Sequence, residues 1–521
     1  MPGMWIPVSQ IYELAERLRY DQDTPFEFLG SLIGMDWGED LGVIYQLSTS
    51  IPGQTLWIKT RVENREDPYI PSVSNLWDIA NLYEREVFCL LGIRFVNHPD
   101  MRRLYLRSAW NGFPLRKDYN PDPALNSLSL ESEPESDILR HLTFTRQGAL
   151  QETKSNLFEK EEYVVNIGPQ HPATHGVLHF RVSLDGEIIR KIDLNLGYIH
   201  RGIEKMCEGY TYPQILHLTD RLDYLSAHMN RHAFCLCVEK GLQIEIPERA
   251  RVIRTMMDEL TRIASHLLAW GCICMDMGAL TAFIYGMRDR EKILDIFEET
   301  CGGRLITNYN VIGGVMADIH PNFVRRVREL IVYLRKILPE YHEVFSGNVI
   351  ARERLQGIGY LSRENAISYG VTGPSGRASG FLCDLRKHEP YAAYDKVQFK
   401  EIVRLEGDSY ARYMARLDEI YESLSILEQL VDQIPEGPFQ VKTKPVIRLP
   451  EGEYSQWVEA SRGIFGVYIN SQGEKTPYRV KFRSPCLSLV SVVDLISRGE
   501  KIADLIAIGG SLDYVVPDID R

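Results

Sequence analysis

The sequence predicts an α+β chain, in which a small N-terminal α/β domain precedes a larger, mainly helical domain with β-rich N- and C-terminal parts. Two strand-like segments flank a Pro-Gly turn near the N-terminus. A stretch rich in Ser, Glu and Pro then interrupts the apolar pattern. Beyond this stretch, long segments repeat their apolar residues at helical spacing, and strand-like segments precede and follow them. The 521 residues are enough for about two to four domains.

The N-terminal domain is expected to span residues 1–120. Residues 8–19 predict an amphipathic helix, and residues 42–48 and 55–62 predict strands on either side of the Pro-Gly turn. Residues 74–91 predict a second helix, because their apolar side chains recur every three or four positions.

Residues 121–160 are expected to be a linker, since they contain LNSLSLESEPESD and lack a sustained apolar period. A linker between two self-contained patterns suggests that two ancestral subunits became fused.

The C-terminal domain is expected to span residues 161–521. It opens with a strand at 163–167 and a hairpin of strands 177–184 and 187–194, joined at Asp185-Gly186. Helices are predicted at 212–240, 248–270, 321–338 and 399–433, short strands within 445–480, and a last helix at 486–502.

Composition narrows the classes of function. The chain has 59 basic and 71 acidic residues, a formal charge of −12, which argues against nucleic acid as the main partner. The nine cysteines form no CxxC pair, so no metal site is expected and the thiols are expected to be reduced. The first residues lack the pattern of a signal peptide.

One apolar segment, residues 263–287, is long enough to span a bilayer. It contains His266 and Asp276 and is interrupted by glycines. We therefore expect a buried helix, a bend and a second buried stretch.

Three polar positions are candidates for chemistry. His171 and His175 are four apart in GPQHPATHG, but Pro172 argues against the helix that a zinc motif needs, and a surface histidine is the plainer interpretation. Tyr224, in DRLDYLSAHMNRH, has the spacing of a core tyrosine. Asp276 lies in an apolar run, where a carboxylate is costly unless it is paired or functional.

Several motifs together carry a family resemblance. GPQHPATHGVLHF, LGYIHRGIEK, DRLDYLSAHMN and GSLDYVVPDIDR resemble the D subunit of respiratory complex I, and NLYEREVFCLLGIRFVNHPDMRRLYL with GFPLRKDY resembles its C subunit. The motifs follow in the right order and cover nearly the whole chain except the linker. The resemblance implies a fused C/D subunit of an NADH:quinone oxidoreductase.

The D subunit is in turn similar to the large subunit of nickel–iron hydrogenases. Their four metal-binding cysteines would fall on Asp223, Ser226, Val515 and Asp518, so all four thiolates are absent. Because nickel needs these ligands, the hydrogenase alternative fails on ligand chemistry, and no metal is expected in this chain. The resemblance implies instead that a quinone pocket occupies the vacated site.

The family pattern implies roles for five residues. The quinone head-group is expected to bind between His175 and Tyr224, which hydrogen-bond its two oxygens and donate protons. Asp276 is expected to orient and reprotonate His175. Arg201 and Arg221 match arginines beside a terminal iron–sulfur cluster that belongs to a neighbouring subunit.

The resemblance also implies partners and a location. The partners expected are the terminal-cluster (B) subunit, the ferredoxin-like (I) subunit, the membrane (A and H) subunits and quinone. The chain would lie peripherally on the cytoplasmic side of a bacterial inner membrane, in a complex that translocates protons. A structural scaffold, and a complex that accepts electrons from ferredoxin instead of NADH, remain alternatives.

The sequence departs from the family pattern at Ile306, where many members carry a histidine near the terminal cluster. Isoleucine cannot titrate, so reduction of that cluster should not be coupled to protonation at this position. The loss of a potential cation should also lower the cluster's potential, which suits menaquinone better than ubiquinone.

Overall fold

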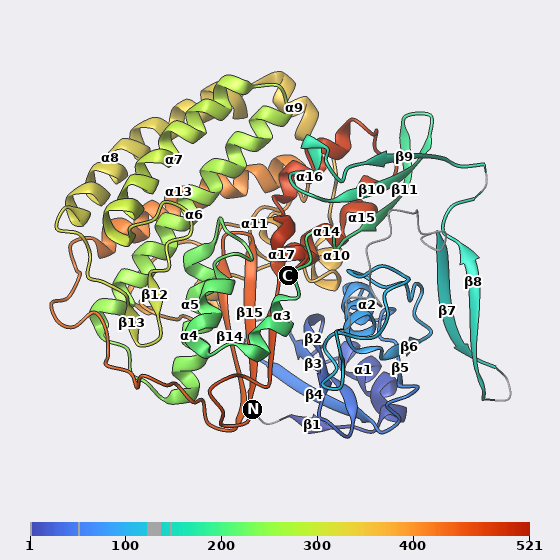
Figure 1. The fold of residues 1–521 in the computed structure, drawn as a ribbon. Helices are drawn as coiled ribbons and strands as arrows, with labels where there is room; N and C mark the ends of the chain where they lie inside the picture. The colour runs from blue at the N-terminus through green and yellow to red at the C-terminus, as the bar shows by residue number, and fades with distance from the viewer. Residues whose placement is uncertain (1–2, 50–52, 122–136, 146–147, 160) are drawn as a thin grey trace.

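The computed structural model describes residues 3–49, 53–121, 137–145, 148–159 and 161–521. Its N-terminal part lies beside a larger part in which long helices stack on one side of a C-terminal sheet (Figure 1). Helices and several small sheets occur together, so the predicted α+β class is confirmed.

The N-terminal part is built around a four-stranded sheet of order β1-β4-β3-β2, in which only β1 runs parallel to its neighbour. Its elements, in chain order, are β1 (Met4–Trp5), η1 (Val8–Gln10), α1 (Ile11–Arg19), β2 (Phe28–Asp36), β3 (Leu41–Ser48), β4 (Thr55–Val62), β5 (Tyr69–Pro71), α2 (Ala80–Leu91) and β6 (Arg94–Val96). The predicted helix at 74–91 begins only at Ala80, because residues 74–79 form turns.

The stretch predicted to be a linker contains a β hairpin, of β7 (Ile138–Phe144) and β8 (Leu150–Asn156). Backbone bonds from Asn97 and Met101 to the carbonyls of Leu142 and Arg140 attach β7 to the N-terminal part. These long-range bonds order a segment whose composition indicated irregular chain. Residues 122–136, which include most of the Ser- and Glu-rich motif, lie outside the described residues.

The C-terminal part has two three-stranded sheets and a layer of long helices. Its strands are β9 (Tyr163–Ile167), β10 (His179–Asp185), β11 (Ile188–Asn195), β12 (Asn310–Val311), β13 (Gly314–Val315), β14 (Gly452–Ala460), β15 (Gly463–Ser471) and β16 (Arg479–Arg483). Its longer helices are α5 (Ala227–Leu242), α6 (Glu248–Asp276), α7 (Leu280–Cys301), α8 (Phe323–Tyr341) and α13 (Ser409–Leu430). Its shorter helices are η3 (Pro172–Thr174), α3 (Ile203–Gly209), α4 (Tyr212–Thr219), η4 (His342–Ser346), α9 (Val349–Leu355), α10 (Arg363–Ser368), α11 (Gly373–Arg377), α12 (Leu385–His388), η5 (Tyr394–Lys396), α14 (Pro485–Ser491), α15 (Val493–Ser497), α16 (Asp504–Leu512) and α17 (Val516–Ile519).

The predicted helix at 212–240 is interrupted. It ends as α4 at Thr219 and resumes as α5 at Ala227, with turns between. Two ion pairs hold these turns, from Arg231 to Asp220 at 3.0 Å and from Arg462 to Asp223 at 3.1 Å. Apolar spacing continues through the break and therefore could not reveal it.

The apolar segment 263–287 forms the end of α6, a bend, and the start of α7, as predicted. The second stretch is not buried throughout, since Leu280 and Ile284 are more than half exposed. No helix in the described part of the chain is long and apolar enough to cross a membrane. The single last helix predicted at 486–502 is instead the two short helices α14 and α15, with α16 and α17 after them.

The two parts share one apolar core and a buried ion cluster. Side chains from α2 and from α14, α16 and α17 belong to the same hydrophobic cluster. Glu86 of α2 accepts two 2.8 Å bonds from Arg521 and also pairs with Lys481 of β16. Separating the partners of a buried ion pair would leave a buried charge without compensation, which is costly. These contacts therefore hold the two parts in a fixed position relative to each other.

Candidate functional site

His175 and Asp276 form a hydrogen-bonded pair. The imidazole Nε2 of His175 lies 2.8 Å from Oδ2 of Asp276. Both side chains are largely buried, with 19% and 8% of their surfaces exposed. The structure describes no partner for Nδ1 of His175, so this nitrogen is available to a ligand.

The loop that carries His175 is held in an uncommon backbone conformation. His175 has φ 52°, in the left-handed region that non-glycine residues rarely adopt. The loop packs on α16, where Gly510 makes the approach possible. A Cβ at Gly510 would lie 2.8 Å from Oδ2 of Asp276 and 3.8 Å from Cε1 of His175. The histidine motif forms η3 and turns rather than an α-helix, and His171 is exposed, so the two histidines do not form a helical zinc motif.

Electrostatics favour a charged imidazole here. Burial works against protonation of His175, but the hydrogen bond and the charge of Asp276, with the charge of Asp513, outweigh it and raise the pKa of His175. Asp276 is the last residue of the long helix α6, where the negative end of the helix dipole favours a nearby cation such as the imidazolium of His175. The pair is therefore arranged to hold a proton.

Tyr224 lies in the interrupted segment between α4 and α5. Its side chain is 37% exposed, and its hydroxyl binds no other described residue. Burial raises the pKa of Tyr224, the charge of Arg462 opposes this, and Asp223, Cys272 and Asp513 raise it further. Tyr224 is therefore a neutral hydrogen-bond donor on a partly exposed side chain.

Arg462 ties this segment to the rest of the site. Its buried guanidinium donates to Asp223 at 3.1 Å, to the Asp513 carboxylate at 2.9 Å and to Ser265 Oγ of α6 at 3.0 Å. The charge of Asp513 in turn acts on both His175 and Tyr224. Arg462 and Asp513 thus join the two halves of the candidate site.

The four positions expected to match metal-binding cysteines carry no thiolate. Burial raises the pKa of Asp518, and the charge of Asp223 raises it further, so these two segments come together. Asp518 accepts from Ser484 and from the backbone of Cys486, whereas Asp223 pairs with Arg462. Among the described residues there is no group of three or more His, Cys, Asp or Glu side chains that could hold a metal.

Arg201 and Arg221 lie together at the surface beside this segment. Nη2 of Arg201 donates to the carbonyl of Arg221 at 2.8 Å, and neither side chain forms an ion pair with a described residue. Burial and the charge of Arg221 lower the pKa of Arg201. Ile306 is half-buried in a neighbouring loop. In the same loop, Oδ1 of Asn308 lies 3.0 Å from Nδ1 of His217 of α4.

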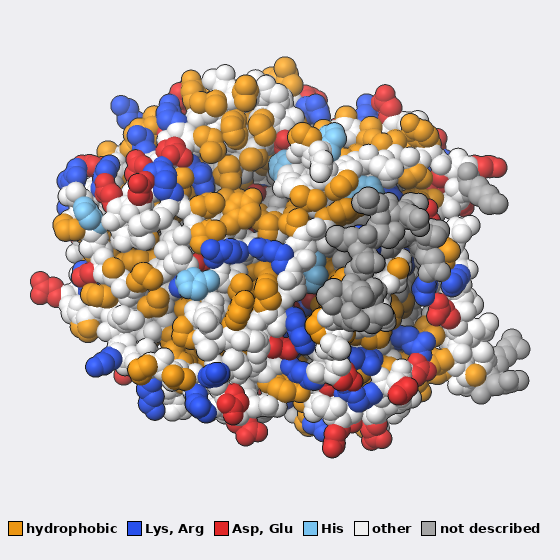
Figure 2. Space-filling model, in the orientation of Figure 1, with side chains coloured by type: hydrophobic (Ala, Val, Ile, Leu, Met, Phe, Trp, Pro, Cys, Tyr) orange, Lys and Arg blue, Asp and Glu red, His pale blue; other side chains and the backbone are white. Residues whose placement is uncertain are grey.

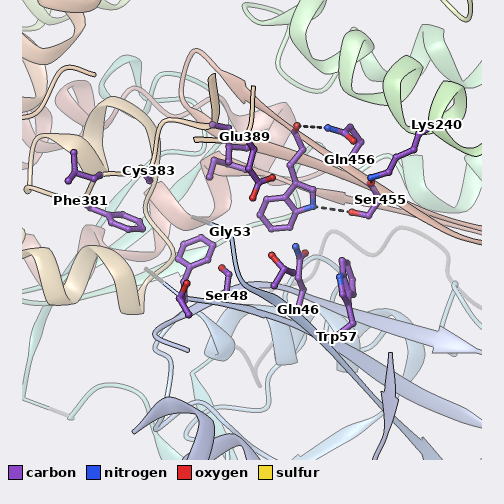
Figure 3. Close-up of a pocket in the computed structure, with 17 residues that line it drawn as sticks. Gln46, Ser48, Gly53, Trp57, Lys240, Phe381, Cys383, Glu389, Ser455 and Gln456 are labelled. Carbon is purple, nitrogen blue, oxygen red and sulfur yellow. Dashed lines mark hydrogen bonds between the residues drawn. The ribbon is translucent and has the colours of Figure 1, made fainter. Parts of the chain in front are cut away.

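A separate pocket of about 230 Å³ lies where the N-terminal sheet meets β14 (Figure 3). Gln46, Ser48 and Trp57 line it from the N-terminal strands, and Ser455 and Gln456 line it from β14. None of the predicted site residues takes part, so this pocket is a gap between the two parts and not the candidate site.

Sequence reasoning missed several residues of the site. Asp513 belongs to the C-terminal motif GSLDYVVPDIDR, which was a signal for its importance. Gly510 is the first residue of the same motif, whereas Cys272 gave no signal, because small residues in apolar helices are common. Arg462 gave none at all, since its three partners are distant in the sequence.

Comparison with known proteins identifies two family models. The model of the respiratory-chain NADH dehydrogenase 30 Kd subunit matches residues 4–124. The model of the respiratory-chain NADH dehydrogenase 49 Kd subunit matches residues 276–447 and 439–521. The first match covers the N-terminal part, and the second covers the helical part from Asp276 onward.

Curated relatives match over the full length. The C/D subunit of the NADH-quinone oxidoreductase of Bacteroides fragilis is 62% identical over 517 residues, 97% of both chains. The C/D subunit from Phocaeicola vulgatus is 60% identical, and 99% of each chain is covered. The D subunit from Desulfotalea psychrophila is 47% identical over 362 residues, which are 69% of this chain and 97% of that one. The chain therefore belongs to the family of fused C/D subunits of NADH-quinone oxidoreductase, the respiratory complex I.

Proposed function

We propose that this subunit forms one side of the quinone-reduction site of its complex, with His175 and Tyr224 as the proton donors to the quinone head-group. The proposal rests on the His175–Asp276 pair and on Tyr224, whose hydroxyl has no described partner; the charge of Asp513 acts on both His175 and Tyr224. A quinone has two carbonyl oxygens, and reduction adds two electrons and two protons. Nδ1 of a protonated His175 and the hydroxyl of Tyr224 supply one donor for each oxygen.

Proton transfer in this proposal follows the arrival of electrons. Two electrons reach the quinone, one at a time, from the neighbouring subunit's terminal iron–sulfur cluster. As negative charge develops on each oxygen, His175 and Tyr224 donate their protons and a quinol results. Asp276 stabilises the imidazolium before transfer and favours its reprotonation afterwards. Arg201 and Arg221 would favour the reduced cluster by their positive charge.

The surroundings support a site completed by other subunits. Tyr224 is open on one side, and hydrophobic side chains gather over α7 and α9 on the face shown in Figure 2. Leu280, Ile284, Val349 and Ile350 are each more than half exposed there. Surfaces of this kind mark protein or membrane contacts. We propose that the terminal-cluster, ferredoxin-like and membrane subunits are the partners, on the cytoplasmic side of a bacterial inner membrane, with NADH as donor and proton translocation as the coupled process.

Tyr224→Phe in the purified complex tests the proposal. The lost hydrogen bond contributes roughly 0.5–1.5 kcal/mol to a neutral head-group and more as charge develops. We expect quinone turnover to fall while reduction of an artificial acceptor upstream of quinone is unchanged. Tyr210→Phe, at another exposed tyrosine, is the control. Wild-type quinone turnover in an assembled Tyr224→Phe complex would contradict the proposed role.

A further inference from the structure

Arg290 of α7 differs from the other buried arginines of the chain. Only 8% of its surface is exposed, yet the described residues offer it no hydrogen bond and no ion pair. By contrast, Arg254 pairs with Glu239, and Arg377 pairs with Glu419 and Glu459. Arg412 has no carboxylate but donates to Ser511, Ser409 and two carbonyls.

An unpaired guanidinium is costly to bury, because it loses its hydration without gaining a partner. Its Nε is sealed from solvent and has no acceptor among the described residues, whereas its two Nη atoms are not sealed and are the donors that a ligand could reach. Arginine stays protonated in proteins, so the side chain cannot avoid this cost by losing its proton. Such a group is stabilised when an acceptor or an anion enters the site.

The position of Arg290 indicates which ligand this is. Burial is the largest effect on the pKa of Arg290 and lowers it, and the charge of Arg304 lowers it as well. The charges of Glu291, Cys272 and Tyr224 act in the opposite direction and raise this pKa. Arg290 is therefore near enough to Tyr224 to interact with its ionised form. Cys272 lies one helical turn before Asp276 on α6, which packs closely on α7. The Cα–Cβ bond of a helical residue is tilted toward the N-terminus of its helix, and the N-terminal end of α7 is the end that follows the bend after Asp276.

We propose that Arg290 is a further binding residue of the quinone pocket and donates hydrogen bonds to a head-group oxygen as negative charge develops on it. The inference rests on the proposed function. The ligand class is a quinone oxygen that becomes anionic during reduction, for which a planar, permanently charged donor is well suited. Arg290 also lowers the cost of the tyrosinate that forms when Tyr224 gives up its proton.

The test compares Arg290→Met and Arg290→Lys in the assembled complex, with a short-chain benzoquinone and a short-chain naphthoquinone as acceptors. The interaction grows as charge develops, so Arg290→Met should lower kcat by roughly 10- to 100-fold and change KM less. Arg290→Lys should be intermediate, because a lysine keeps the charge but not the planar geometry. Electron transfer from NADH to ferricyanide should be unchanged in both variants.

Arg288→Met is the matched control. It lies on the same helix two residues away and is already paired with Asp289 at 2.8 Å. Wild-type quinone kinetics in Arg290→Met would overturn the inference. If Arg290→Met does not assemble, Arg290→Lys decides. Wild-type quinone kinetics in Arg290→Lys would indicate that the positive charge serves a contact with a neighbouring subunit. This result would also overturn the inference.

Tyr224→Phe is measured alongside. If Tyr224→Phe lowers quinone turnover and Arg290→Met does not, only the role of Arg290 fails. If neither variant lowers it, the proposed quinone site fails as well.

Discussion

Nε2 of His175 lies 2.8 Å from Oδ2 of Asp276, although the two residues are 101 positions apart in the chain. One comes from a loop between a strand and a hairpin, and the other ends the long helix α6. Their pairing raises the pKa of His175 despite its burial. The geometry and the charge of this pair lead to the first two predictions.

Asp276→Asn should shift the pH dependence of quinone reduction. The variant loses the charge that raises the pKa of His175, whereas burial continues to lower it, so the imidazole should lose its proton at a lower pH. Turnover that needs the imidazolium should therefore begin to fall at a pH about one unit or more lower in the variant than in the unmodified complex. The measurement is kcat for quinone between about pH 6 and 9, the range around an ordinary histidine pKa.

Asp185→Asn is a suitable control for this experiment, because Asp185 also pairs with a basic side chain but lies exposed in the β10–β11 hairpin. An unchanged pH profile in Asp276→Asn would show that the pair does not set the protonation of His175.

Gly510→Ala should disturb the same pair without unfolding α16. The added methyl would lie 2.8 Å from Oδ2 of Asp276, so that carboxylate must move away. Alanine favours a helix over glycine by up to about 1 kcal/mol, so thermal stability should change little. We expect a shift of the pH profile in the same direction as in Asp276→Asn, but smaller.

Gly509→Ala is its matched control on the adjacent residue, where the new methyl would meet only the side chain of Tyr514, at 3.3 Å or more. Equal effects of the two substitutions would mean that the helix, and not the His175–Asp276 contact, is responsible.

The purified chain should contain no stoichiometric nickel. At the positions that match metal-binding cysteines, Asp223 is already paired with Arg462. The nearby Cys486 has a pKa well above its ordinary value because of burial and the charges of Asp518 and Asp223, so it is a protonated thiol and a poor ligand. Elemental analysis is the measurement, and one nickel per chain would refute the assignment.

Ile306→His should introduce a pH dependence into the potential of the neighbouring terminal cluster. With isoleucine, we expect a potential nearly independent of pH between roughly 6 and 8, where a histidine would titrate. The midpoint potential of a centre that takes up one proton with each electron shifts by about 59 mV per pH unit. Redox titration of the assembled complex at several pH values tests this.

A steep slope in the unmodified complex would eliminate the role of Ile306. A slope that appears only in Ile306→His would establish that this position sets the coupling. The low potential expected without a cation here is also the reason to expect menaquinone as the acceptor.

Local patterns in the sequence predicted much of the fold and the residues of interest. Apolar periodicity predicted the α+β class, the strands β3, β4 and β9 and most long helices, because burial of one face imposes a repeat on neighbouring residues. The family motifs pointed to His175, Tyr224 and Asp276 as residues to examine together. Their catalytic roles, and the division of the chain at residues 121–160, remain predictions.

Other features depend on contacts between residues that are distant in the sequence. The break at Asp220–Ser226 depends on Arg231 and Arg462, the β7–β8 hairpin depends on backbone bonds to residues 97–101, and Gly510 matters only because Asp276 lies against it. Ion pairs and close contacts of this kind join residues far apart in the chain, so they leave no local period in the sequence. A buried arginine such as Arg290 is likewise conspicuous only after folding, when its environment shows that it has no described partner.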